Sequence, residues 1–101
     1  MIPLVQNNLK SIQQILHKHN VKHAYVFGSA CTKNFNDNSD IDIIVAFQKR
    51  YFDNYVDNYL SLESELSKLL QREIDIISED TIQNPYFIQS INQTKIPIYE
   101  S

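Results

Sequence analysis

The chain has 101 residues, of which 43% are hydrophobic and 21% are charged. This length and composition predict one globular domain, spanning residues 1–101, and they argue against a disordered protein. The net charge of −3 offers no basic field for phosphate backbones, so direct binding of long nucleic acid is not expected.

Helical and strand patterns alternate in the first half of the chain. Apolar residues at helical spacing predict a helix that begins at Pro3, and Asn20 suits a left-handed residue after its end. β-branched and aromatic runs then predict strands on either side of a polar segment. The elements expected here are a helix over 3–19, a strand over 23–27, a loop over 31–39 and a strand over 40–47.

An amphipathic helix dominates the second half of the chain. Its apolar residues recur at three- and four-residue spacing up to Leu70. Pro97 cannot donate a main-chain hydrogen bond, which places the last strand at a sheet edge. The elements expected here are a helix over 51–70, a strand over 73–77, a helix over 84–92 and a strand over 95–99. The order α-β-β-α-β-α-β predicts an α/β (α+β) fold, a small mixed sheet with helices packed on it.

The one glycine of the sequence, Gly28, lies at the predicted end of the first strand, directly before Ser29. A glycine at this point lets a ligand approach the main chain, and a serine near a helix start suits a phosphate group. The pair alone is also typical of a plain turn.

Three aspartates interrupt apolar strands. Asp40 and Asp42 are two residues apart and so project from one face of a strand, and Asp75 interrupts a later strand in the same way. Two carboxylates about 5 Å apart repel by roughly 3 kcal/mol at an effective dielectric constant of 20, a penalty that a magnesium ion removes. A solvated sheet rim is the alternative for the first pair. In a two-metal displacement the third acid either ligates an ion or accepts the proton of the attacking hydroxyl. We therefore expect catalytic and metal-binding roles for all three acids, with two Mg²⁺ ions.

The spacing of these residues resembles a family signature. Gly28-Ser29, ten further residues and Asp40-Ile41-Asp42 are similar to the G-S-x10-D-x-D signature of the polymerase-β-like nucleotidyltransferase superfamily. The segments YVFGSA and NSDIDIIVAF resemble the minimal nucleotidyltransferase (MNT) family, and REIDIIS stands in the place of its third acidic strand.

The resemblance implies the polymerase-β-like nucleotidyltransferase fold and assigns roles to individual residues. Many relatives carry a basic residue and a glycine soon after the Gly-Ser pair, whereas this chain has Thr32 and Lys33. We expect Lys33 to contact the triphosphate, and the substitution leaves a weak or inactive enzyme as an alternative. The implied roles are nucleotide binding by Gly28 and Ser29, metal binding by Asp40 and Asp42, and completion of the site by Asp75.

The MNT resemblance also implies a biological role. The family is typically encoded beside a HEPN-domain protein, a small helical ribonuclease, and resembles the antitoxin of that pair. We therefore expect an ATP-dependent protein adenylyltransferase that transfers AMP to a tyrosine of a HEPN toxin, in a homo- or hetero-oligomer. Two alternatives stay open. One is a binding-only antitoxin that masks its partner, and the other is a small-molecule adenylyltransferase.

Other residues are expected to have structural roles. Tyr51, Tyr55 and Tyr59 recur at four-residue spacing, which favours core packing, with a partner-binding surface as the alternative. His17 and His19 are two apart on a helix, so they are interpreted as surface histidines rather than joint metal ligands.

Cysteine content and hydropathy bear on the compartment. Cys31 has no second cysteine to pair with, and no apolar run approaches the roughly 20 residues that a membrane-spanning helix needs. The N-terminal apolar run is too short, and too uncharged at its start, for a secretory signal. We expect a cytoplasmic protein that does not contact a membrane.

Overall fold

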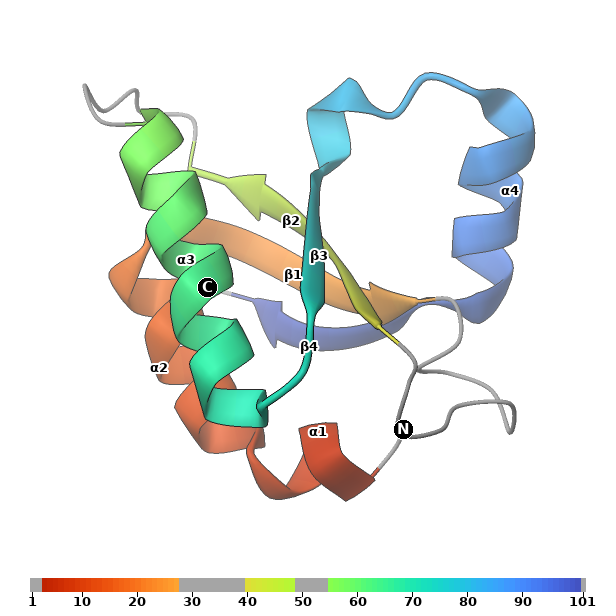
Figure 1. Ribbon diagram of the computed structural model, residues 1–101. Helices are drawn as coiled ribbons and strands as arrows, with labels where there is room; N and C mark the ends of the chain where they lie inside the picture. Colours follow the sequence, from red (N-terminus) through yellow and green to blue (C-terminus); the bar gives the residue numbers. More distant parts are fainter. Residues whose placement is uncertain (1–2, 28–39, 49–54, 101) are drawn as a thin grey trace.

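The computed structural model describes residues 3–27, 40–48 and 55–100, which form a four-stranded mixed sheet with helices on both faces (Figure 1). The predicted fold class is therefore confirmed. In chain order the elements are α1 (Pro3–Asn7), α2 (Leu9–Lys18), β1 (Val21–Phe27), β2 (Ile41–Phe47), α3 (Tyr55–Leu70), β3 (Ile74–Ser78), the 3-10 turn η2 (Glu79–Thr81), α4 (Pro85–Thr94) and β4 (Ile96–Glu100).

The strand order among the described residues is β3-β2-β1-β4. Strand β1 is antiparallel to both of its neighbours, whereas β2 and β3 are parallel. A parallel pair needs a crossover connection, and helix α3 provides it. Strand β4 lies at an edge, as Pro97 predicted, and β3 forms the opposite edge.

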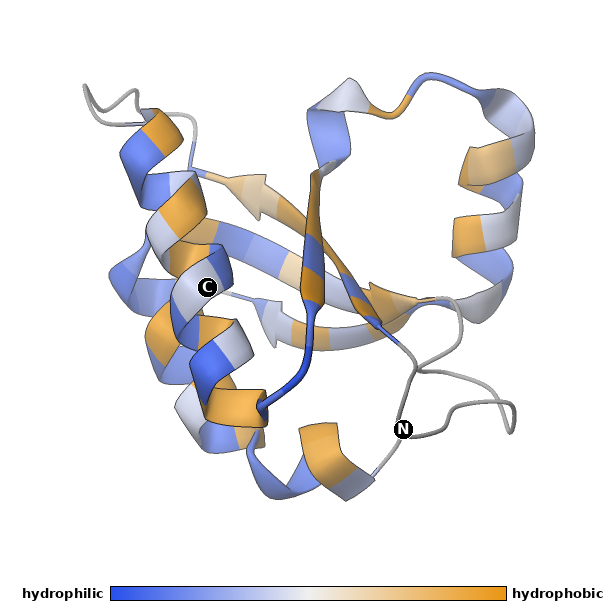
Figure 2. Ribbon diagram, in the orientation of Figure 1, coloured by the Kyte–Doolittle hydropathy of each residue, from blue (hydrophilic) through white to orange (hydrophobic). Residues whose placement is uncertain are grey.

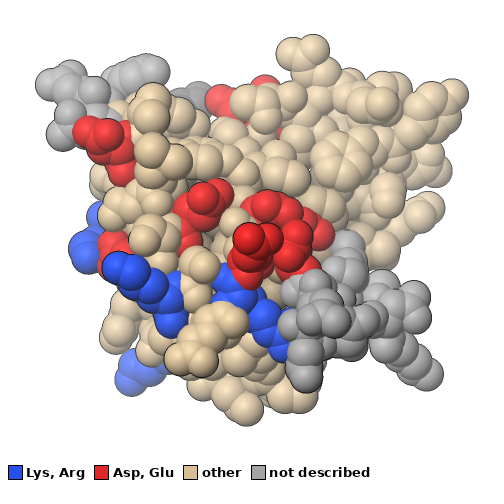
Figure 3. All heavy atoms as spheres, viewed as in Figure 1, with Lys and Arg blue, Asp and Glu red and all other residues tan. Residues whose placement is uncertain are grey.

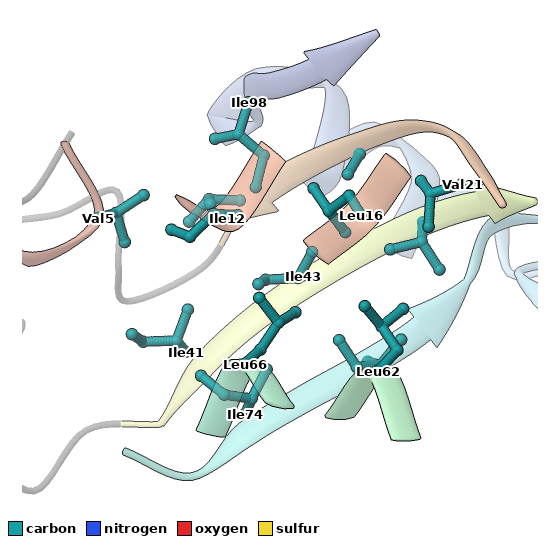
Figure 4. Packing of buried hydrophobic residues seen from close by; sticks show 14 of the residues in the cluster. Val5, Ile12, Leu16, Val21, Ile41, Ile43, Leu62, Leu66, Ile74 and Ile98 are labelled. Carbon is teal, nitrogen blue, oxygen red and sulfur yellow. The ribbon is translucent and has the colours of Figure 1, made fainter. Parts of the chain in front are cut away.

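The main core lies between the sheet and the layer formed by α1, α2 and α3 (Figure 4). Helix α2 contributes Ile12 and Leu16, and α3 contributes Leu62 and Leu66, all fully buried. Each such side chain contributes about 1.5–3 kcal/mol relative to an exposed position. Figure 2 shows apolar and hydrophilic residues alternating along α3, as expected for a helix with one buried side.

A smaller core lies on the other face of the sheet, beneath α4. Phe27 of β1, Ile44 of β2 and Ile91 of α4 are buried together there. Phe87 of α4 meets the Phe27 ring edge-on, with 5.8 Å between the ring centroids. Asn84 caps the start of helix α4, because its side chain accepts hydrogen bonds from the main-chain N–H groups of Tyr86 and Phe87.

The predicted first helix is two helices, because the chain breaks at Asn8. The Nδ2 group of Asn8 donates to the carbonyl of Leu4 at 2.8 Å, and the main-chain N–H of Asn8 bonds Val5 instead. The side chain thus bonds the Leu4 carbonyl, which would accept from the main-chain N–H of Asn8 in a continuous helix. Asn20 has a φ of 64°, which confirms the predicted left-handed residue.

The structure separates the two interpretations of the tyrosine stripe. Tyr59 packs against the main core, so the core-packing interpretation is confirmed for it. The ring centroids of Tyr55 and Tyr59 lie 5.4 and 6.3 Å from that of Phe47, so Tyr55 contacts the half-buried Phe47 ring. Tyr51 lies outside the described residues.

The surface interpretation of His19 was wrong. His19 is only 4% exposed, and its Nδ1 lies 2.8 Å from the carbonyl oxygen of Ile15. Its Nε2 lies 2.9 Å from Oε2 of Glu65 on α3. His19 therefore joins the end of α2 to α3, a pairing that helical spacing alone does not reveal. His17 is exposed, as predicted.

Within the described ranges, none of the helices combines the length and the apolar character that crossing a membrane requires.

Candidate active site on strands β2 and β3

Two of the three predicted acids lie opposite each other on neighbouring strands. The parallel register pairs Asp42 of β2 with Asp75 of β3. The antiparallel register pairs Asp42 with Phe27, the residue before Gly28. Because neighbouring strands lie about 4.8 Å apart, Phe27, Asp42 and Asp75 form one row across three strands.

Strand alternation sets the face on which the two acids lie. Ile41 and Ile43 flank Asp42, and Ile74 and Ile76 flank Asp75, and all four are buried in the main core. Since successive side chains point to opposite faces, both acids point away from that core. Asp42 is partly buried there and Asp75 is exposed.

The two carboxyl groups interact electrostatically. Burial, followed by the charge of Asp75 and a hydrogen bond with its side chain, raises the pKa of Asp42 to about 6. The charge of Asp40 acts in the same direction. Two carboxyl groups share a hydrogen bond only while one of them is protonated, so this bond is lost as Asp42 ionises above a pH of about 6. The pair is therefore a place where the fold keeps two like charges together at neutral pH.

This arrangement fits a divalent cation. A cation between Asp42 and Asp75 would replace the shared proton and offset the repulsion, and hard carboxylate oxygens suit magnesium. Among residues 3–27, 40–48 and 55–100, however, no three Asp, Glu, His or Cys residues are grouped so that they could hold a metal ion. Asp40 is exposed and precedes the first residue of β2. The three-acid magnesium site therefore stays a prediction.

The predicted nucleotide-binding residues Gly28, Ser29 and Lys33 lie outside the described residues. Their chain position is nevertheless informative. The described part of β1 ends at Phe27, which pairs with Asp42, and Gly28-Ser29 directly follow Phe27 in the sequence.

Sequence comparison places the chain in a known family. The family described as Polymerase beta, Nucleotidyltransferase matches residues 10–101. The chain belongs to this nucleotidyltransferase family. The predicted resemblance is confirmed, and so is the predicted class of enzyme.

Curated relatives of this nucleotidyltransferase occur in Methanocaldococcus jannaschii. The protein MJ1379 is 34% identical over 96 residues, which cover 87% of this chain and 95% of the relative. The protein MJ0126 is 34% identical over 98 residues, which cover 89% of this chain and 97% of the relative. The names of both relatives assign them provisionally as protein adenylyltransferases.

Solved structures share the fold of this nucleotidyltransferase. A structure provisionally named as a minimal nucleotidyltransferase has a TM-score of 0.77 at 23% identity, covering 95% of this chain and 96% of that chain. A chain from a toxin–antitoxin structure with AMP-PNP has a TM-score of 0.73 at 22% identity, covering 93% and 74%. A chain from the complex of the tri-AMPylated Shewanella oneidensis HEPN toxin with its MNT antitoxin has a TM-score of 0.67 at 20% identity, covering 95% and 72%.

Sequence reasoning missed one contact beside the nucleotidyltransferase acids. The hydroxyl of Tyr59 on α3 donates to the main-chain carbonyl of Ile76, the residue after Asp75. Burial, followed by the charges of Glu63, the Tyr55 group and Asp75, raises the pKa of Tyr59, so the hydroxyl remains a donor. The bond ties edge strand β3 to α3. Helical spacing predicted the ring packing of Tyr59 but contains no information about its hydroxyl.

A polar cavity of about 660 Å³ opens beside Asp75. Its walls come from the second half of α3, the turn that follows and the start of β3, and they include Ser64, Lys68 and Arg72. Gln71 forms the turn with a φ of 54°, and the hydroxyl of Ser67 donates to the carbonyl of Arg72 at 2.6 Å.

Proposed function

We propose that this nucleotidyltransferase is a magnesium-dependent protein adenylyltransferase that acts as an antitoxin by transferring AMP from ATP to a tyrosine of a HEPN-domain toxin. The observation that carries this proposal is the pairing of Asp42 with Asp75 in the parallel register. Asp42 also pairs with Phe27, the residue that precedes the Gly-Ser pair in the sequence. The names of the 34% identical relatives support protein as the acceptor. The toxin–antitoxin structure with AMP-PNP and the AMPylated HEPN complex support ATP and a HEPN partner.

The acids of the chain divide the work of the reaction. Magnesium, when bound, supplies positive charge to the triphosphate and the attacking oxygen. Asp40 and Asp42 would hold the metal, and Asp75 would either complete its ligands or accept the proton of the acceptor hydroxyl. The hydroxyl oxygen forms a bond to the α-phosphorus, and the bond from that phosphorus to the bridging oxygen breaks, releasing pyrophosphate.

The remaining predicted residues hold the nucleotide. Gly28 and Ser29 bind the phosphates through main-chain N–H groups and a hydroxyl, and Lys33 adds a positive charge. The reaction takes place in the cytoplasm, where ATP and magnesium are available.

Exposed apolar side chains favour a second candidate, the binding-only antitoxin. Val56 and Leu60 on α3 are 65% and 55% exposed, and Tyr86 on α4 is 82% exposed. Such residues are typical of protein interfaces. In this alternative the chain inhibits its partner by covering it, and the acids play no part.

One experiment separates the two candidates. The chain is mixed with the HEPN-domain protein encoded beside it and radiolabelled ATP, with magnesium or with a chelator, and labelled protein is identified by mass spectrometry. We expect magnesium-dependent AMP on a tyrosine, loss of that product in Asp42→Asn, and full activity in the matched control Asp57→Asn on exposed α3. If the wild-type chain forms a stable complex and neutralises the toxin without labelling it, the binding-only candidate holds.

A further inference from the structure

A second cavity lies on the face of the sheet to which the acids point. Its volume is about 180 Å³, and Tyr25 of β1 and Ile44 of β2 line it together with residues of α4. Both strand residues pack in the smaller core beneath α4. Asp42 points to the same face, because its neighbours Ile41 and Ile43 lie in the main core. The cavity and the Asp42 carboxyl group therefore lie on one face of the sheet.

The cavity is one step along the strands from the acid pair. Tyr25 pairs with Ile44 in the antiparallel register, and Ile44 pairs with Ile77 in the parallel register. On this face, that row is the next one after the row that contains Asp42 and Asp75, at a distance of roughly 7 Å for two residues of a strand. In the proposed function the α-phosphate lies beside the two acids, because the metal that they would hold contacts it. A base joined to that phosphate through a ribose reaches the next row, where the cavity lies.

The size of the cavity suits one aromatic ring system. A cavity of about 150 Å³ in an engineered protein binds benzene. The volume of about 180 Å³ therefore accepts a ring system and excludes a whole nucleotide. The described lining includes four isoleucines and a tyrosine, which favour a flat ring over a sugar or a phosphate.

Polar groups in the lining favour a heterocyclic base over a plain phenyl ring. Asn92, Glu79 and Lys95 line the cavity, and Nζ of Lys95 lies 4.5 Å from the centroid of the Tyr25 ring. The Asn92 amide offers a donor and an acceptor side by side, which matches the amino group and the ring nitrogen on one edge of adenine. The Glu79 carboxylate contacts Nε2 of His23 at 3.0 Å and has further lone pairs for an amino group. The ring of an acceptor tyrosine has no such groups on its edge.

The charges around the cavity suit a neutral ligand. Helix α4 contains no Asp, Glu, Lys or Arg. Figure 3 shows Asp and Glu atoms gathered in the middle of the molecule, whereas the side formed by α4 shows neither acidic nor basic atoms. In the described lining of the cavity, Glu79 and Lys95 balance each other. A nucleobase is uncharged at neutral pH, so it fits this region better than a phosphate or a charged side chain does.

We propose that the cavity beneath α4 binds the base of the nucleoside triphosphate and prefers adenine, whose amino edge hydrogen-bonds Asn92 and Glu79. The inference rests on the proposed function and deepens it by assigning the residues that select the nucleotide.

A substitution that fills the cavity tests its location without a catalytic step. Ile88 lines the cavity and is 40% exposed, so the fold tolerates tryptophan there. Ile88→Trp should weaken binding of AMP-PNP with magnesium about tenfold or more in calorimetry, because the base loses its contacts. Binding of magnesium tripolyphosphate, which has no base, should stay unchanged. Tyr86→Trp is the matched control on the same helix, since Tyr86 is 82% exposed and lies outside the lining, and it should bind both ligands as wild type does.

Two results of this experiment would overturn the inference. One is an equal effect of Ile88→Trp on AMP-PNP and tripolyphosphate, including no effect on either. The other is unchanged AMP-PNP binding together with a raised KM for the partner protein, which would assign the cavity to the acceptor instead.

A second variant tests the choice of base. Adenosine and inosine, in a chelator, are titrated into the 15N-labelled chain, and the amide shifts of α4, β1 and β2 are followed by NMR. Wild type should bind adenosine about tenfold more tightly than inosine, which has an oxo group in place of the amino group. Asn92→Leu should bring this ratio close to one, whereas Gln93→Leu, at the exposed next position outside the lining, should preserve it.

The outcomes of the titration separate this inference from the proposed function. An unchanged ratio in Asn92→Leu, or shifts confined to residues away from the cavity, would overturn the inference even if the chain transfers AMP. If the wild-type chain transfers no AMP but binds adenosine at α4 with the expected preference, the proposed function fails and the base-binding site stands.

Discussion

Asparagine in place of Asp42 should make the protein more stable at neutral pH. Folding raises the pKa of this carboxyl from 3.8 to about 6, mainly through burial and then through Asp75, so the folded state disfavours its charged form. The stability that the carboxyl contributes is therefore fully present below pH 3.8 and is lost as the pH rises to about 6. A shift of this size corresponds to about 3 kcal/mol, which solvent screening of a partly exposed group reduces to about 1–2 kcal/mol.

Thermal unfolding followed by circular dichroism between pH 4 and pH 8, in a chelator, measures this effect. For a domain of this size each kcal/mol shifts Tm by about 4–8 °C, so Asp42→Asn should unfold several degrees above wild type at pH 8. At pH 4 the two curves should nearly coincide. Asp57→Asn, which removes an exposed carboxylate of α3, should show no such gain. A variant that is less stable than wild type at pH 8, or a gap that is equal at both pH values, would show that the fold does not strain the Asp42 charge.

Three further substitutions test the site and the fold. Asp75→Asn should lower the transfer rate about 100-fold or more, as an enzyme assay measures. It should also lower the pKa of Asp42 part of the way to its ordinary value, because the effect of burial remains; carboxyl NMR titration measures this pKa. Tyr59→Phe removes the hydrogen bond to β3 and should cost about 1 kcal/mol in chemical denaturation, whereas Tyr86→Phe, at a position that is 82% exposed, should cost nothing measurable. Leu66→Ala in the main core should cost about 2–5 kcal/mol, and Leu60→Ala, at a position that is 55% exposed, less than about 0.5 kcal/mol; equal costs would contradict the assigned packing.

Strand alternation predicted much of the site. Because apolar residues flank both Asp42 and Asp75, the sequence predicts that each acid points to the face opposite that of its apolar neighbours. The pairing of these two acids with each other does not, since it depends on the parallel register that α3 allows. The family resemblance supplied the expectation that the two strands are neighbours.

Contacts made by single polar atoms were beyond sequence reasoning. The break at Asn8 depends on one side-chain amide that reaches Leu4, and the burial of His19 depends on how α2 meets α3. Periodicity reports which side of a helix is apolar and does not reveal such bonds. The polar cavity is a similar case, because its walls combine a helix end, a turn and a strand start that share no repeating pattern.

The position of β3 at the sheet border affects how the site is held together. Asp42 is carried by an interior strand with neighbours on both sides, whereas Asp75 is carried by a strand that has one strand neighbour and the bond from Tyr59. Amide hydrogens of β3 should therefore exchange with solvent faster than those of β2. A protein that binds along this border would slow that exchange and restrict the motion of Asp75. Binding of the substrate protein would then fix the position of this acid in the site.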